Sequence, residues 1–152
     1  MVHETIVESL KDVITVCSSI IESAEIDIAW LFPAPMLAMA AQYNLKSRGL
    51  MQKGGRVRGI TTISSPYAET VSVLLDIGVD LRHIENDIGS FLLVGDKSQS
   101  ISSTNFNVKD LSLDDKIVAF WTDDPDYAEY LLSNFDIAWA EATDAQKRIH
   151  EF

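Results

Sequence analysis

Residues 25–32 place the strongest constraint on the fold of this chain. Their sequence, EIDIAWLF, alternates polar and apolar side chains, then becomes fully apolar, and is followed by Pro33. Such a run is typical of a strand that enters the interior of a sheet covered on both faces. Proline ends the strand because it cannot donate a hydrogen bond to the ladder. The rest of the chain must therefore supply helices for both faces of a sheet.

Helical and strand patterns alternate through the first half of the chain. Apolar residues recur at helical spacing, and Ser64–Ser65 before Pro66 supplies a helix N-cap. These patterns predict helices over residues 4–23, 35–53 and 66–76 and strands over residues 25–32, 56–63 and 79–84. Three further strands are predicted over residues 90–94, 99–103 and 116–122. A last helix opens at Asp123-Asp124-Pro125, with a capping acid and an early proline, and runs to the chain end.

This order of elements predicts an α/β fold with a mixed sheet flanked by helices on both faces. Residues 1–152 form a single domain in this interpretation, because neither an internal repeat nor a linker interrupts the pattern. The apolar stripe of the last helix continues after the domain should be complete. We therefore expect residues 140–152 to be a helical extension toward an output unit or a second copy of the chain, and we expect a homodimer.

The charge of the chain is strongly acidic but unevenly distributed. Its formal net charge is −11, which disfavours attraction to phosphate, so we expect no direct binding of nucleic acid by this chain. No acidic residue occurs from Ile28 to Ala68, a window that contains Lys46, Arg48, Lys53, Arg56 and Arg58. A solvated basic face is favoured there over an anion site or a docking patch for an acidic partner.

Several features indicate a cytoplasmic chain that does not bind membranes. The longest apolar stretch, residues 28–41, is too short to span a bilayer. The first residues lack the basic and apolar regions of a signal peptide, and the single cysteine, Cys17, cannot form an internal disulfide. The acidic pairs Asp114–Asp115 and Asp123–Asp124 lack the interleaved spacing of a calcium loop. We therefore expect neither a metal nor another cofactor.

The second half of the chain carries a series of local motifs. They are GVDLR at residues 78–82, SFLLVGDK at 90–97, SSTNF at 102–106, FWTDDP at 120–125 and FDIAW at 135–139. In this order they resemble the active-site half of phospholipase D-like proteins, and the resemblance covers roughly residues 20–142. It implies the α/β/α sandwich of that superfamily.

The catalytic residues that the resemblance would require are missing. Catalytic members carry a histidine, a lysine two residues later and an aspartate five residues beyond that, followed by a Gly-Ser-x-Asn segment. Ile88, Ser90 and Gly95 occupy the first three positions here, and the later segment is Ser102, Ser103, Thr104 and Asn105. The superfamily's histidine attacks phosphorus while lysine stabilises the phosphoryl oxygens. A chain without that nucleophile is not expected to be an enzyme.

Losses of this kind resemble the degenerate sensory domains of archaeal TrmB-type transcription regulators and archaeal sensor kinases. That resemblance implies a non-catalytic, signal-sensing or ligand-binding domain of a regulatory protein. Two alternatives stay open. One is a divergent phosphodiesterase or nuclease that acts as a dimer with His83 as a displaced nucleophile, and the other is a protein-interaction module without a small ligand. A structural role for His83, half-buried on a strand, is favoured over a catalytic one.

The candidate ligand site lies where the predicted strands end. In open α/β sheets ligands bind beyond the carboxyl ends of the parallel strands, near helix N-termini. The side chains expected there offer hydroxyl groups, an amide, an imidazole and an aromatic ring to a small polar or anionic ligand. They are Ser64, Ser65, Tyr67, His83, Ser90, Ser103 and Asn105. Ser64 and Ser65 are read more simply as a helix cap, and Asn105 as a turn residue.

Overall fold

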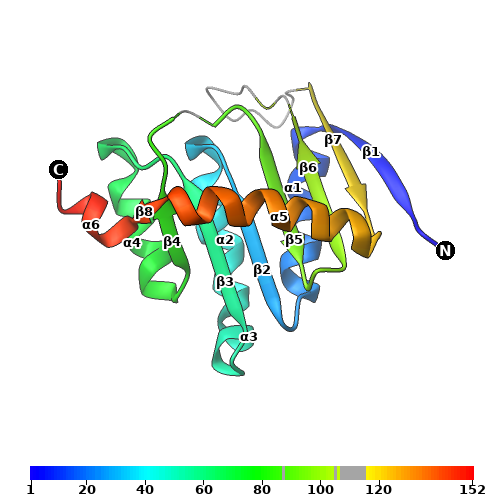
Figure 1. The fold of residues 1–152 in the computed structure, drawn as a ribbon, viewed down its shortest axis with the longest axis horizontal. Helices are drawn as coiled ribbons and strands as arrows, with labels where there is room; N and C mark the ends of the chain where they lie inside the picture. The colour runs from blue at the N-terminus through cyan, green and yellow to red at the C-terminus, as the bar shows by residue number, and fades with distance from the viewer. Residues whose placement is uncertain (87, 105, 107–115) are drawn as a thin grey trace.

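One eight-stranded mixed sheet runs through the molecule (Figure 1). The computed structural model describes residues 1–86, 88–104, 106 and 116–152. The strand order across the sheet is β1-β7-β6-β5-β2-β3-β4-β8. The strands are β1 (Glu4–Ser9), β2 (Asp27–Leu31), β3 (Arg56–Thr61), β4 (Asp80–His83), β5 (Phe91–Gly95), β6 (Gln99–Ser103), β7 (Lys116–Thr122) and β8 (Thr143–Asp144).

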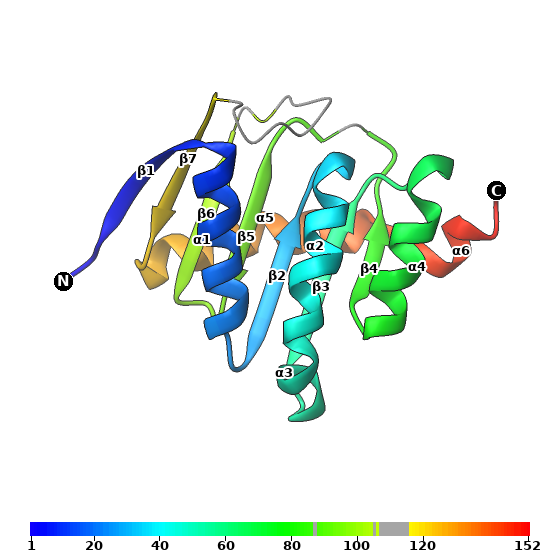
Figure 2. The same ribbon diagram turned by 180° about the vertical axis from the view of Figure 1, so that it is seen from behind.

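Helices cover both faces of the sheet, as the sequence predicts. Three helices, α1 (Leu10–Ser23), α2 (Leu37–Asn44) and α4 (Ala68–Ile77), lie on one face (Figure 2), and α5 (Pro125–Glu141) crosses the other (Figure 1). Short helical segments complete the chain: η1 (Ala34–Met36), η2 (Leu45–Ser47), α3 (Arg48–Gln52), η3 (Ser65–Tyr67) and α6 (Ala145–Ile149). The helix expected over residues 35–53 is thus divided into α2 and α3 by the turn η2. The apolar core accordingly divides into two clusters, one on each face.

The pairing of the strands decides which ends meet at one edge. β2, β3 and β4 run parallel to one another, whereas β5 is antiparallel to β2 and β6 is antiparallel to β5. The carboxyl ends of β2, β3, β4 and β6 therefore lie at the same edge of the sheet as the amino end of β5. This edge carries most of the residues that the sequence singled out.

The amino-terminal expectation was wrong in part, because the helix begins at Leu10 and residues 4–9 form strand β1. β1 pairs antiparallel with β7, with Glu4 opposite Thr122. Ser9 is the N-cap of α1, since its hydroxyl accepts a hydrogen bond from the Asp12 amide at 3.1 Å. Pairing with a strand more than a hundred residues away outweighs the local helical pattern.

The carboxyl-terminal expectation of one helix from Asp123 to the chain end was also wrong. Asp124 caps α5 as expected, but α5 ends at Glu141. Thr143 then pairs with His83 of β4, and α6 follows with Ala145 buried against the sheet. Residues 140–152 therefore return to the domain instead of continuing as one helix away from it. No helix among the described residues is long and apolar enough to cross a membrane.

Cys17 lies fully buried on α1, and burial raises the pKa of its thiol to about 12. Only the thiolate reacts at an appreciable rate with alkylating reagents. We expect iodoacetamide to label the folded protein at least about a hundredfold more slowly than the protein in urea. Mass spectrometry of labelled samples at neutral pH measures both rates. Equal rates would contradict a buried thiol.

Candidate functional site

A cavity of about 300 Å³ lies between α5 and the sheet edge where β5 begins and β6 ends. Residues from both strands, from the end of β2 and from α5 form its walls. They are Leu31, Ser90, Phe91, Leu92, Ser102, Ser103, Thr104, Tyr127, Tyr130, Leu131 and Asn134. The pairing of Phe91 with Ser103 fixes the two motif segments side by side.

The lining of this cavity, as far as the structure describes it, is polar without being charged. Serine, threonine and tyrosine hydroxyls and the amide of Asn134 can donate and accept hydrogen bonds. Leucine side chains and the ring of Tyr127 supply apolar surface. Histidine, lysine, arginine, aspartate and glutamate are all missing from the described lining. The arrangement can hold a small ligand with hydroxyl or amide groups and an apolar face.

The motif positions that the sequence aligned do not all meet at this cavity. Ser90 and Ser103 line it, whereas Gly95 lies at the opposite end of β5, paired with Ile28. A Cβ atom at Gly95 would lie 2.8 Å from Cγ2 of Ile20, so a larger side chain there would require the side chain of Ile20 to shift. The hydroxyl of Ser103 donates to the carbonyl of Val118 at 2.8 Å, a bond that holds β6 against β7. Asn105 lies outside the described residues.

His83 lies away from the cavity, at the end of β4, and is more deeply buried than expected, with 2% of its surface exposed. Its Nδ1 accepts a hydrogen bond from the Ile63 amide at 2.8 Å, and its Nε2 lies 3.1 Å from Oε1 of Glu85. Nδ1 therefore joins the end of β4 to the segment after β3, and Nε2 is engaged by the carboxylate of Glu85, just beyond β4. This geometry fits a structural histidine and leaves no lone pair directed at a ligand.

The remaining predicted site residues lie beyond β3. Ser64 precedes η3, and Ser65 and Tyr67 form it. Ser64 occupies the capping position in an extended conformation, but its side chain makes no capping hydrogen bond. None of the three lines the cavity near β5 and β6. The single pocket expected from all the strand ends is therefore divided, with Ser90 and Ser103 in one place and the residues near His83 in another.

The α5 side of the cavity was not anticipated from the sequence. Four residues from successive turns of α5 line the cavity: Tyr127, Tyr130, Leu131 and Asn134. Their spacing, at i, i+3, i+4 and i+7, is that of one helix face. Two tyrosines and an asparagine on an otherwise apolar face were the available signal. Which strands these residues face, however, is known only from the position of α5 across the sheet.

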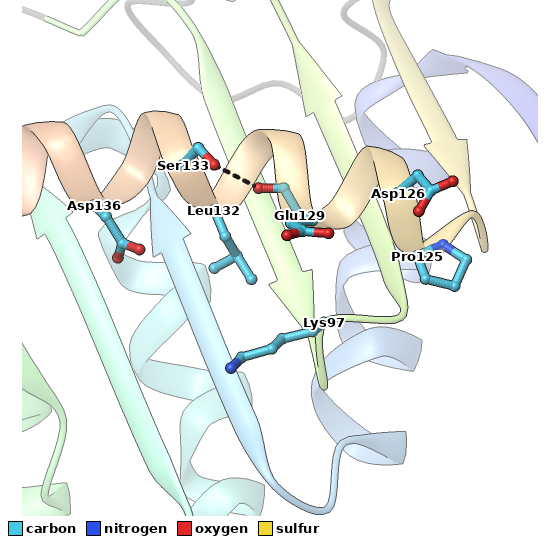
Figure 3. Close-up of a pocket in the computed structure, with 7 residues that line it drawn as sticks. All are labelled: Lys97, Pro125, Asp126, Glu129, Leu132, Ser133 and Asp136. Atoms are coloured by element: carbon cyan, nitrogen blue, oxygen red, sulfur yellow. Dashed lines mark hydrogen bonds between the residues drawn. The ribbon is translucent and has the colours of Figure 1, made fainter.

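A larger cleft of about 470 Å³ lies on the other flank of α5, beside the turn between β5 and β6 (Figure 3). Lys97 of that turn lies across the cleft from Glu129 and Asp136 of α5, whereas the carboxylate of Asp126 points away from Lys97 (Figure 3). One of these, Asp136, is already paired with Arg58 at 3.1 Å. The cleft is therefore a charged surface, and one of its carboxylates, that of Asp136, already joins α5 to β3 through Arg58. Among the described residues no group of three His, Cys, Asp or Glu side chains is arranged to hold a metal, and Asp114–Asp115 lies outside those residues.

Part of the basic window is engaged within the domain. Lys46 pairs with Glu22, and the pairing lowers the pKa of the Glu22 carboxyl. Arg58 lies over the rings of Phe135 and Trp139, with its guanidinium carbon 4.9 Å and 5.6 Å from the ring centroids. These basic side chains are thus engaged by acidic groups and by the carboxyl half of α5.

Comparison with solved structures shows a phospholipase D-like fold. Nuc from Salmonella typhimurium, a phospholipase D family member, matches with a TM-score of 0.73 and 15% identity over 95% of this chain and 98% of Nuc. NucT from Helicobacter pylori matches with a TM-score of 0.69 and 12% identity over 95% of this chain and 99% of NucT. No protein-family model matches the sequence, and no curated protein matches it significantly.

TrmBL2, an archaeal chromatin protein with a novel mode of DNA binding, has a similar structure. The TM-score is 0.68 and the identity is 14%, over 93% of this chain and 54% of TrmBL2. The chain therefore spans about half the length of TrmBL2. This likeness contradicts the expectation that a chain of this kind does not bind nucleic acid directly, because a protein with the same fold is a DNA-binding protein. The acidic net charge of the chain was therefore not sufficient reason to exclude binding of nucleic acid.

Proposed function

We propose that this chain, which has the phospholipase D-like fold, is a non-catalytic domain of a regulatory protein and binds a small uncharged ligand between α5 and the sheet. One observation carries the proposal. The cavity is lined by Ser90, at the aligned lysine position, and by Ser102 and Ser103 of the later motif segment, and its described lining has no charged side chain. Neutral hydroxyl groups thus line the cavity in place of the charged side chains that a phosphoryl-transfer site needs.

The chemistry of the lining disfavours phosphoryl transfer. That reaction needs a nucleophile and cationic groups to stabilise the phosphoryl oxygens. The chain has three histidines, His3, His83 and His150, and none of them lines the cavity. Enclosing an anion without a compensating cation is also costly. We therefore narrow the expected ligand from polar or anionic to polar and uncharged.

The regulatory part of the proposal is supported by TrmBL2 and by the course of α5. The match covers about half of TrmBL2, so in that protein the fold is one part of a longer chain. Here α5 contributes Tyr127 and Asn134 to the cavity and reaches β3 through Asp136. A ligand that moves α5 would therefore also move the segment β8–α6 that follows it. The cytoplasmic location stays a prediction.

Thermal shift measurements test ligand binding directly. We expect some member of a panel of uncharged polyols, amides and nucleosides at millimolar concentration to raise the Tm by a few degrees, while phosphate and carboxylates do not. Ser90→Phe should fill the cavity and abolish the shift. Ser72→Phe, at an exposed position of α4, is the matched control and should preserve it. If no uncharged compound shifts the Tm, or if Ser90→Phe leaves the shift unchanged, the cavity is not the ligand site.

Hydrolysis assays test the non-catalytic part of the proposal. We expect no release of nitrophenol from bis-p-nitrophenyl phosphate above the rate of a heat-denatured sample. Activity that copurifies with the protein and disappears in His83→Ala would overturn the proposal and favour a divergent phosphodiesterase. His83→Gln, which keeps a hydrogen-bonding side chain, separates that loss from unfolding when circular dichroism is measured on both variants.

A further inference from the structure

Strand β1 forms an exposed edge of the sheet. In the part of the chain that the structure describes, β1 pairs with β7 and with no other strand. The carbonyl of His3 accepts a hydrogen bond from the Asp123 amide at 3.1 Å, so the backbone of His3 faces β7. Backbone groups alternate in direction along an antiparallel strand. The N–H and C=O groups of Glu4 and Ile6 therefore face away from the sheet.

A groove of about 370 Å³ runs beside this edge. One wall is β1, from Thr5 to Glu8, and the other is the first half of α1, with Asp12, Thr15 and Val16. An edge strand beside a helix is the arrangement by which extended peptides are added to a sheet as a further strand. Backbone hydrogen bonds then supply affinity, and the groove selects alternate side chains.

The side chains along the edge point to the chemistry of the peptide. Glu4 and Glu8 are exposed and flank Ile6, an apolar side chain with 54% of its surface exposed. Asp12 adds a third carboxylate on the helical wall of the groove. No ion pair engages any of these three carboxylates among the described residues. The edge thus presents two acidic positions around an apolar one, with a period of two residues.

We propose that β1 binds an extended basic segment of a partner protein by strand addition. Directly opposed residues on neighbouring strands interact most strongly when their charges are opposite or when both are apolar. The complementary peptide therefore has basic, apolar and basic residues at alternate positions, opposite Glu4, Ile6 and Glu8. This surface is separate from the cavity beneath α5, so the proposal does not depend on the ligand site.

Edge strands also carry charges that prevent pairing with other sheets, and the irregularity between Val7 and Ser9 could serve the same purpose. The two roles differ in what they expect of a basic peptide. A purely protective edge binds no peptide of either charge. A docking edge discriminates by charge, because its glutamates attract a basic strand and repel an acidic one.

Fluorescence anisotropy with two labelled peptides distinguishes these roles. One peptide contains Lys-Thr-Val-Thr-Lys and the other contains Glu-Thr-Val-Thr-Glu in the same flanking sequence. We expect the basic peptide to bind the full chain at low salt at least about tenfold more tightly than the acidic one. We also expect amide exchange at Ile6 to slow when the basic peptide is present. Equal affinity for the two peptides, or no binding of either, would overturn the proposal.

Two variants locate the binding to β1. Glu4→Lys combined with Glu8→Lys should invert the preference for the two peptides, whereas Glu69→Lys combined with Glu141→Lys makes the same charge change at exposed positions elsewhere and should preserve it. Ile6→Pro removes an outward-facing N–H group without touching the bonds to β7, so it should weaken binding about tenfold while the Tm stays close to that of the wild type. An unchanged preference in the double Glu4/Glu8 variant would show that the peptide binds elsewhere.

Discussion

Replacing Asp96 with alanine should lower the free energy of unfolding by about 3 kcal/mol, because hydrogen bonds to an ionised group contribute more than neutral ones. The carboxylate of Asp96 accepts three of them, from the backbone amides of Glu25, Ile26 and Asp27 at 2.9, 2.8 and 2.9 Å. Together they fix the connection between α1 and β2 to the turn after β5. Alanine would leave three amides without this partner at the start of the central strand.

Urea denaturation followed by tryptophan fluorescence measures this effect. Asp96→Asn keeps an acceptor oxygen and suits the positive φ of 54° at this position, so it should lose about half as much stability as Asp96→Ala. Asp126→Ala, at the exposed start of α5, is the control for loss of a surface carboxylate and should change stability by less than about 1 kcal/mol. An Asp96→Ala protein within about 0.5 kcal/mol of the wild type would show that water replaces the carboxylate at little cost.

The position of Asp96 shows whether this carboxylate can stand in for the aspartate of the superfamily's catalytic motif. By sequence, Gly95 occupies the superfamily's aspartate position, and the pattern alone does not say what the neighbouring carboxylate does. In the structure Asp96 caps the backbone before β2, at the end of β5 far from the cavity. Its role is therefore structural. Its presence beside the aligned position does not restore a catalytic set.

Much of the fold could be predicted because its signals are local. The strand expected over residues 99–103 corresponds to β6 without displacement, and Asp124 caps α5 where the sequence indicated. Turn residues, proline and N-caps act over a few positions and leave their mark in the sequence. β1 was missed because Ile6 and Val7 also fit a helical stripe. Only the contact with β7, distant in the chain, decides between the two structures.

The candidate site was harder to predict than the fold, for a related reason. Ser90 and Ser103 could be placed together because adjacent antiparallel strands bring their segments opposite each other. Tyr127 and Tyr130 reach the same cavity only because α5 crosses the sheet over β5 and β6. The division between Ser90 and His83 follows from the strand order, since β2 and β3 lie between β5 and β4. Residue patterns within single elements do not contain that order.

The second large effect is expected at Gly59, where alanine should lower the free energy of unfolding by about 3 kcal/mol, because overpacked cores shift side chains and backbone. Gly59 lies on β3 directly beside Trp30 of β2, and a Cβ atom there would overlap the indole ring. The ring cannot move aside easily, since Trp30 is fully buried and stacked on Phe32 with centroids 4.7 Å apart. The close approach of backbone to ring is thus the reason for glycine at this position.

Two further variants separate this clash from the general effect of a glycine substitution. Gly49 lies in α3, where an added Cβ atom would have open space within 4 Å, so Gly49→Ala should stabilise the protein by about 0.5 kcal/mol through helix propensity. Trp30→Phe makes room beside Gly59 and removes an indole Nε1 that is buried without a hydrogen-bond partner among the described residues. The double variant Trp30→Phe with Gly59→Ala should therefore be more stable in urea than Gly59→Ala alone. If the double variant is instead less stable, steric overlap with the indole is not the cause, and the packing of Phe32 against Trp30 outweighs it.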